Sequence, residues 1–250
     1  MKIAVDFGHG TGQDRGASGY LNEEKVIREY GPLVIAGLQK LGHTVYNVTP
    51  TQGGLTLGQS LAYRVNKANY YNVDLFLCLH VNAFKTDQAQ GAEVEYKSSS
   101  GKVYANEIEN ELLKLGFTEH GEGSVQRNNL YVLNHTNAVA VLVEPFFCDN
   151  KSDCNKYNPK TLANAIIRGV TGHDVYLGNP YVVTNYLPIG AYGIELNALW
   201  YKYFANLGIE RWYMKHDTKG MWIETQYLTQ EKCVELKNRL GNLFYAIKNN

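Results

Sequence analysis

Three ionisable side chains stand at the ends of strongly apolar runs. Such runs are typical of a buried core, where an ionisable group is costly unless it has a partner or a function. His9 follows "KIAVDFG", His80 follows "VDLFLCL" and Glu144 ends "AVAVLVE". An unpaired carboxylate in such a setting must find a partner or become protonated. A lone histidine at a strand end is usually only hydrogen-bonded, but these three share one position, the carboxyl end of a predicted strand. In open parallel sheets ligand sites form at those ends.

Two histidines on neighbouring strand ends suit a borderline-soft cation such as zinc, and a catalytic zinc takes a third protein ligand. The sequence offers Glu23 and Glu24 in "YLNEEKV", behind Asn22 as a predicted helix N-cap. Acidic residues are also favoured at a helix start by the helix dipole alone. From the residues alone, Glu23 and Glu24 can either stabilise the start of the helix or supply the third metal ligand.

The elements that must position these side chains alternate between two hydrophobic periods over about the first 170 residues. Several strand-like runs are apolar on both faces, as in a sheet covered on both sides. Pro32 predicts a kink or a break in the first helix. The alternation predicts an α/β domain with a mostly parallel twisted sheet flanked by helices. Strands are predicted over 2–7, 43–48, 73–80, 92–96, 129–133 and 139–144, and helices over 23–42, 57–71, 101–116 and 159–172.

The amino-acid composition and the hydrophobic pattern of the sequence change after about residue 175. The last part holds nine of the nineteen Tyr and all three Trp, and its pattern predicts a small α+β unit in the order β-α-β-β-α-β. We therefore expect two domains, 1–174 and 181–250. The aromatic residues of the second can stack on sugars or fill its core, with the choice left open for Trp200, Tyr201, Tyr203, Phe204 and Trp212.

Composition narrows the class of partner. The chain has 250 residues and no net charge, which argues against a nucleic-acid binder. No apolar stretch reaches the length of a membrane span, and the four cysteines lack paired zinc spacing. The N-terminal apolar run is too short for a signal peptide, so we expect synthesis in the cytoplasm. The oligomeric state is left open.

Three segments resemble, in order, the type 3 family of zinc-dependent N-acetylmuramoyl-L-alanine amidases. They are "DFGHGTGQDRGASGYLNEEKV", "LGQSLAYRVNKANYYNVDLFLCLHVNAF" and "LYVLNHTNAVAVLVEPFFCDN", within about residues 2–172. The family places Ser where this chain has Cys78, and Pro where it has Val139. The second segment matches the family motif at Arg64, Asn69, Asp74, His80, Asn82 and Ala83.

The resemblance implies zinc ligands at His9, Glu23 and His80 and a catalytic base at Glu144. Counting back from the end of the first helix favours Glu23 over Glu24. The implied reaction is hydrolysis of the amide between N-acetylmuramic acid and L-alanine by a zinc-activated water. Peptidoglycan, both glycan and stem peptide, is then the partner. His135 lies near a basic family position and is a candidate substrate contact or an exposed loop residue.

Because the sequence shows no signal peptide, we expect a lysin of the endolysin type, from a phage or a spore-forming host, that is made inside the cell and acts on the cell wall after release. The second domain is similar in pattern to the sporulation-related repeat domain, which binds glycan strands, and is expected to bind the wall. Two alternatives remain. A peptidoglycan glycosidase would use two carboxylates such as Glu93 and Glu144, and a non-catalytic wall-binding protein would need neither base nor metal.

Overall fold

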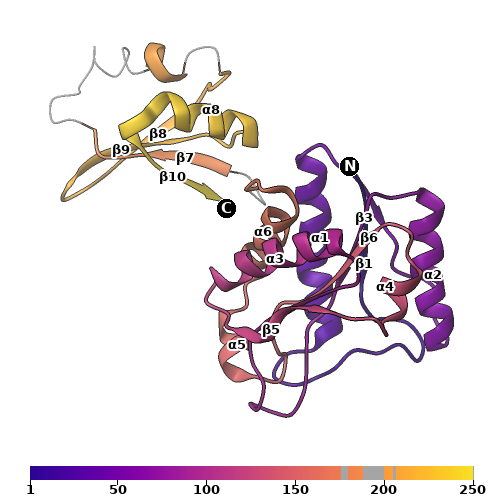
Figure 1. Ribbon diagram of the computed structural model, residues 1–250. Helices are drawn as coiled ribbons and strands as arrows, with labels where there is room; N and C mark the ends of the chain where they lie inside the picture. The colour runs from indigo at the N-terminus through magenta and orange to yellow at the C-terminus, as the bar shows by residue number, and fades with distance from the viewer. Residues whose placement is uncertain (176–179, 188–199, 205–206, 250) are drawn as a thin grey trace. The chain divides into compact units, whose positions relative to one another are not determined.

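The computed structural model describes residues 1–175, 180–187, 200–204 and 207–249. Its contacts divide the chain into two compact units, Met1–Val175 and Tyr176–Asn250. Each unit has its own sheet and its own buried core, and each is described separately (Figure 1).

The first unit is built on a six-stranded sheet with the order β2-β1-β3-β6-β4-β5. The pairs β2–β1, β1–β3, β3–β6 and β4–β5 are parallel, and only β4 runs antiparallel to its neighbour β6. The predicted α/β fold with a mostly parallel sheet is therefore confirmed. The strands are β1 (Lys2–Phe7), β2 (Thr44–Asn47), β3 (Leu75–Leu79), β4 (Ala92–Tyr96), β5 (Glu119–Gln126) and β6 (Val139–Glu144).

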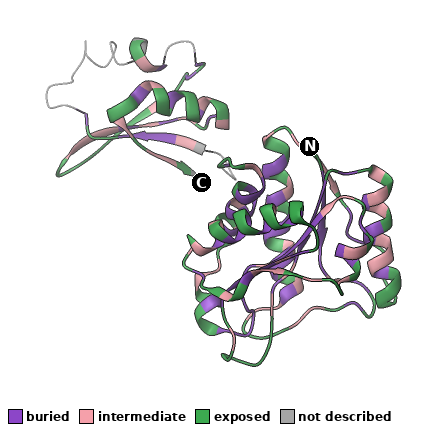
Figure 2. Cartoon of the chain, in the orientation of Figure 1, coloured by how far each residue is buried: buried purple, intermediate pink, exposed green. Residues whose placement is uncertain are grey.

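Helices cover both faces of this sheet. One face carries α1, α3 and α6, which pack side by side, and the other carries α2 and α4 (Figure 1). The central strands are buried along most of their length (Figure 2), which explains their apolar runs. The helices are α1 (Glu23–Lys40), α2 (Leu57–Tyr71), α3 (Ser99–Leu113), α4 (Tyr131–His135), α5 (Lys151–Lys156) and α6 (Pro159–Thr171).

One element prediction was wrong, one strand was not predicted, and Pro32, where a kink or a break was expected, lies inside a continuous α1. The segment 129–133, predicted as a strand, enters the short helix α4, because a short apolar run does not distinguish a strand from one buried helical turn. Strand β5 was not predicted, since its polar, glycine-containing sequence at the sheet edge has no hydrophobic alternation. Pro32 does not break α1: it lies on the exposed side, where water can bond the carbonyl that proline leaves without a donor.

The second unit holds a four-stranded sheet with the order β10-β7-β9-β8 and antiparallel pairs. Helix α8 (Gln230–Leu240) packs on one face through Cys233 and Leu236. Most of the first helix of the expected β-α-β-β-α-β order lies outside the described residues, which show a helical turn at Trp200–Phe204. The strands are β7 (Pro180–Thr184), β8 (Trp212–Asp217), β9 (Gly220–Thr225) and β10 (Phe244–Asn249).

The core of this unit includes three of the aromatic residues that sequence left open. Phe204 is buried, and Tyr203 and Trp212 pack against the same cluster. These three therefore fill the core, whereas the side chains of Trp200 and Tyr201 lie outside the described part. Within the described residues of the whole chain, no helix combines the length and the apolar character needed to cross a membrane.

Candidate metal centre

The two histidines lie on neighbouring parallel strands at the same edge of the sheet. Phe7 and Leu79 are paired at the ends of β1 and β3, and the chain continues from there to His9 and His80. The two imidazole rings meet edge to face, with centroids 4.6 Å apart. A Cβ at Gly8 would stand 2.5 Å from the ring of His80, so glycine at this position makes room for that ring.

Helix α1 brings the third donor. Asn22 caps the helix by accepting from the backbone of Lys25, which sets Glu23 in the first turn with its side chain buried. Glu23 Oε1 lies 3.2 Å from Nε2 of His9 and 3.0 Å from Nδ1 of His80. Glu24 instead pairs with Arg15 at 2.7 Å. Of the two acidic residues that open the helix, Glu23 is the one that faces the histidines.

This trio could hold a metal ion. One donor atom from each of His9, Glu23 and His80 falls within 4.8 Å of the others, and among the described residues no second group of three or more His, Cys, Asp or Glu meets that condition. The imidazoles are 22% and 17% exposed, so an ion can reach them from solvent. Two imidazoles and one carboxylate form a donor set that zinc uses in catalytic sites.

Asp14 orients the first histidine. Its Oδ1 lies 2.9 Å from Nδ1 of His9, and its Oδ2 accepts from the hydroxyl of Ser60 at 2.6 Å. Such a carboxylate fixes the tautomer and leaves Nε2 free toward the centre. Asp14 was not among the residues predicted to act at the centre, although it lies within the first segment that resembles the family.

Two arginines hold the backbone of the His9 loop. Arg28 and Arg64 donate to the carbonyl of His9 at 2.8 and 2.9 Å. Arg64 is itself buried and pairs with Asp6. His9 has a φ of 58°, a conformation that costs energy for a residue other than glycine and therefore needs such support.

The three side chains of His9, Glu23 and His80, which we call the donor group, favour positive charge between them even without a metal ion. Burial alone would lower the pKa of His9, but the hydrogen bonds and charges of Asp14 and Glu23 outweigh it and raise this pKa to about 9. Burial would raise the pKa of Glu23, yet the bonds from His80 and His9 hold it well below its ordinary value. Without a metal, a proton on His9 supplies the charge that these residues favour.

Glu144 ends β6 beside His80. The backbone of His80 donates to the carbonyl of Val143 at 3.0 Å, so the two side chains follow adjacent strands. Oε2 of Glu144 is closed off from solvent and has no hydrogen-bond partner among the described residues. Burial raises the pKa of Glu144 well above its ordinary value, and the charges of Glu23, Glu95 and Glu93 add to this rise.

The other sequence candidates lie outside the donor group. Glu93 is the cross-strand partner of Glu144, but its carboxylate is engaged by Arg127 at 2.5 Å. His135 is exposed at the end of α4 and stacks on Tyr131 with centroids 4.0 Å apart. The side-chain amide of Asn69 donates a hydrogen bond to the carbonyl of His135, and its oxygen accepts one from the backbone N–H of Asn137. These two bonds join α2 to the start of β6.

Known proteins are similar to this chain in sequence and in fold. Residues 3–172 match the family model described as N-acetylmuramoyl-L-alanine amidase. The amidase LytC of Bacillus subtilis is 32% identical over 163 residues, covering 62% of this chain and 31% of LytC. The endolysin of Bacillus phage SPP1 is 30% identical over 180 residues, covering 67% of this chain and 62% of the endolysin.

Among solved structures, the catalytic domain of the CD27L endolysin targeting Clostridia difficile is 31% identical with a TM-score of 0.65. The match covers 70% of this chain and 99% of that domain. Two uncharacterized Clostridium perfringens proteins are each 32% identical, and the chain spans 47% and 48% of their length. Because the family model matches more than half of the chain, this protein belongs to the N-acetylmuramoyl-L-alanine amidase family through residues 3–172.

Proposed function

We propose that the first unit hydrolyses the amide bond between N-acetylmuramic acid and L-alanine in peptidoglycan, with Zn²⁺ held by His9, Glu23 and His80. The observation that carries this proposal is the convergence of three metal-ligating side chains next to the half-buried carboxylate of Glu144, one oxygen of which is buried and unpartnered. Family membership supports the choice of substrate.

The residues present fit a zinc ion. Asp14 holds His9 with Nε2 directed at the centre, and the carboxylates of Asp14 and Glu23, which raise the pKa of His9, favour positive charge there. Metal binding requires the neutral imidazole, so the ion would take the place of this proton. When bound, zinc would act as a Lewis acid toward the scissile carbonyl and make the attacking water more acidic.

Glu144 carries the proton through the reaction. Its carboxylate accepts the proton of the attacking water as the new C–O bond forms at the carbonyl carbon. It then donates that proton to the nitrogen of L-alanine as the C–N bond breaks. A group that acts first as a base and then as an acid works best when its pKa lies near the operating pH, and burial raises the pKa of Glu144 in the metal-free chain. The products are a free lactyl carboxylate on the sugar and a new N-terminal alanine.

We further propose that the second unit binds the cell wall. The sheet face opposite α8 carries half-exposed aromatic side chains, among them Tyr213 and Tyr227, around a cleft of about 580 Å³. Flat aromatic faces with nearby polar groups suit sugar rings. A wall-binding unit would raise the local concentration of the hydrolase on its polymeric substrate. Together with the similarity to two endolysins, this supports a role in lysis, with the protein acting on the wall after release.

The chemical group that is released from the cell wall distinguishes an amidase from a glycosidase and from a protein that only binds. Purified cell walls treated with the protein should gain N-terminal alanine, measured by amine labelling and mass spectrometry, and should gain no reducing sugar ends. Chelation should abolish this release and zinc should restore it. Release of reducing ends instead would establish the glycosidase, and release of neither product would leave only binding. Full activity in chelator, with metal shown to be absent, would contradict the metal-dependent mechanism.

A further inference from the structure

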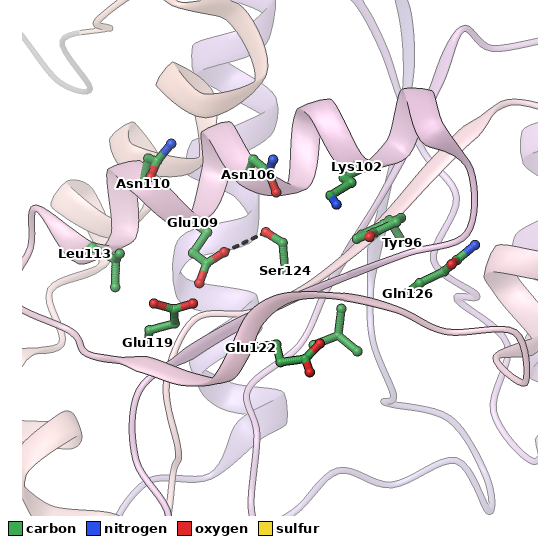
Figure 3. Close-up of a pocket in the computed structure, with 11 residues that line it drawn as sticks. Tyr96, Lys102, Asn106, Glu109, Asn110, Leu113, Glu119, Glu122, Ser124 and Gln126 are labelled. Carbon is green, nitrogen blue, oxygen red and sulfur yellow. Dashed lines mark hydrogen bonds between the residues drawn. The ribbon is translucent and has the colours of Figure 1, made fainter.

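A second polar cleft lies between α3 and β5, apart from the metal centre. Its volume is about 660 Å³, and Figure 3 shows the residues that line it. One stripe of α3 lines it at helical spacing, and β5 faces that stripe across the opening. The polar lining residues that carry the argument are Lys102, Asn106, Glu109, Glu119, Glu122 and Ser124.

Glu109 is an unusual lining residue, because it is only 7% exposed. Its Oε2 accepts from the hydroxyl of Ser124 at 2.6 Å, while its buried Oε1 has no partner among the described residues. A Cβ at Gly123 would lie 1.6 Å from that oxygen, so the glycine provides the space that the carboxylate occupies. A buried acceptor without a donor is costly, and positive charge in the cleft beside this carboxylate would offset part of that cost.

Charge is distributed unevenly along the cleft. Glu109 projects from α3 toward Glu119 on β5 (Figure 3), and Glu122 lies on the same strand. Burial raises the pKa of Glu109, the Ser124 bond opposes this rise, and the negative charge of Glu119 adds to it. Lys102 is seven residues earlier on the helix, which separates it from Glu109 by about 10 Å along the axis at 1.5 Å per residue. The cleft therefore has an acidic end and a basic end.

The acidic end suits an ammonium group better than a metal ion. Calcium takes six to eight oxygens within about 2.6 Å, but these carboxylates do not come within 4.8 Å of one another as a group of three in the described part of the chain. An alkylammonium group donates three hydrogen bonds in separate directions and can serve acceptors that are further apart. We propose that this cleft binds a peptide through the ammonium group of an aliphatic side chain, seated between Glu109 and Glu119.

The position of the cleft connects it to the metal centre. Glu119 is paired with Ala92 on β4, and the next residue of β4, Glu93, is paired with Glu144 on β6. Two strand spacings separate Glu119 from Glu144, a distance of about 10 Å between backbones. A chain of two or three residues spans that distance. The bound group is then the side-chain ammonium of a diamino acid in the stem peptide, an identification that rests on the function proposed above.

The test is a titration of the full-length, zinc-loaded chain followed by NMR. The probe is Nα-acetyl-L-lysine methylamide, and the matched neutral probe carries an acetyl group on the ε-nitrogen as well. The lysine probe should shift the resonances of Gly123 and Ser124, less so at high salt, and the acetylated probe should not. Glu109→Gln and Glu119→Gln should each weaken binding by about tenfold. Glu119 is exposed, so its variant does not depend on tolerance of a buried change.

Glu107→Gln is the matched control, because Glu107 is exposed on the same helix and does not line the cleft. It should bind the probe like the unchanged chain. Equal shifts from the acetylated probe, unchanged binding in both cleft variants, or displacement of the probe by millimolar Ca²⁺ would each overturn the proposal. The titration involves no cleavage, so its result is independent of the hydrolase assay. Equal KM values for muropeptides with free and acetylated diamino acids would overturn the stem identification alone.

Discussion

At the scale of single residues, the three carboxylates at the metal centre have different surroundings and therefore different roles. Asp14 and Glu23 are both buried and both contact His9, but Asp14 faces the nitrogen away from the centre and Glu23 the nitrogen toward it. Glu144 has no such partner on its Oε2. Two carboxylates therefore stabilise positive charge, and we propose that the third takes and returns a proton.

The substitution Glu144→Gln should separate chemistry from metal binding. It keeps the size of the side chain and removes the proton acceptor, so the chain should retain its zinc while turnover falls by roughly 100- to 10,000-fold. Metal analysis and release of N-terminal alanine measure the two effects on the same sample. Folding should be unaffected, because the amide is easier to bury than the charged carboxylate.

His9→Ala is the comparison variant and should lose metal and activity together. Loss of zinc from Glu144→Gln would show that Glu144 is a ligand and that the role given to Glu23 is wrong. Activity of Glu144→Gln near that of the unchanged chain would mean that the base is another residue.

The pKa shifts predict how the stability of the metal-free chain depends on pH. Glu23 has a lowered pKa, so its contribution is present above the ordinary value of 4.5 and is lost as pH falls. His9 has a raised pKa, so its contribution is complete below 6.5 and is lost as pH rises through about 9. The pair should stabilise the chelated protein most between these two ordinary values. Urea midpoints at pH 5.5 and pH 9.5 measure this.

His9→Gln isolates the contribution, since other groups also titrate over this range. The difference in midpoint between the unchanged chain and this variant should shrink as pH rises from 5.5 to 9.5. A difference that is constant with pH would contradict the charge pairing of His9.

At the scale of elements, α1 connects the two histidine segments. Arg28 donates hydrogen bonds to the carbonyls of Gly8 and His9. The hydroxyl of the buried Tyr30 donates to the carbonyl of His80 at 2.9 Å. The first residue of the same helix is Glu23. One rigid element thus supplies a donor and fixes the backbone at the other two, which is why its continuity through Pro32 matters.

Pro32→Ala should stabilise the first unit. Alanine restores an N–H donor to the carbonyl four residues earlier and removes the steric conflict of the ring, while the gain in unfolded-state entropy offsets part of this. A net gain of about 1 kcal/mol would raise Tm by about 2–4 °C, measurable by calorimetry. Pro159→Ala is the control, because Pro159 begins α6, where proline is favoured, and should bring no gain. A lower Tm for Pro32→Ala would show that the helix needs the proline.

At the scale of the whole molecule, the chain consists of two units with separate cores. Cutting near residue 175 should therefore give two pieces that fold independently, each with its own cooperative transition. The first piece should release N-terminal alanine from small soluble muropeptides, because it contains the entire donor group and Glu144.

The second piece should sediment with purified cell walls and release nothing. Because its aromatic cleft includes Tyr213 and Tyr227, Tyr213→Ala and Tyr227→Ala should reduce the bound fraction. Phe204→Ala should instead lower thermal stability, since Phe204 lies in the core. A second piece that ignores walls altogether would remove the wall-binding role and leave the hydrolase proposal intact.

The sequence by itself determined the fold class and the places where chemistry can occur. Apolar runs predicted the central strands, and a polar residue at the end of such a run marks the sheet edge whichever way the remaining chain folds. Local capping determined the start of α1, which puts Glu23 and Glu24 in one turn. These features depend on neighbours in the sequence, so they can be read without a structure.

Only the tertiary structure decided which groups meet. Glu23 rather than Glu24 faces the histidines because the direction of α1 is set by its packing on the sheet. Asp14 and Arg64 support His9 through contacts that join separate segments, and β5 is a strand because β4 offers it an edge. The cleft at Glu109 exists only because β5 lies against α3. In each case the free energy comes from contacts between distant segments, which no local pattern records.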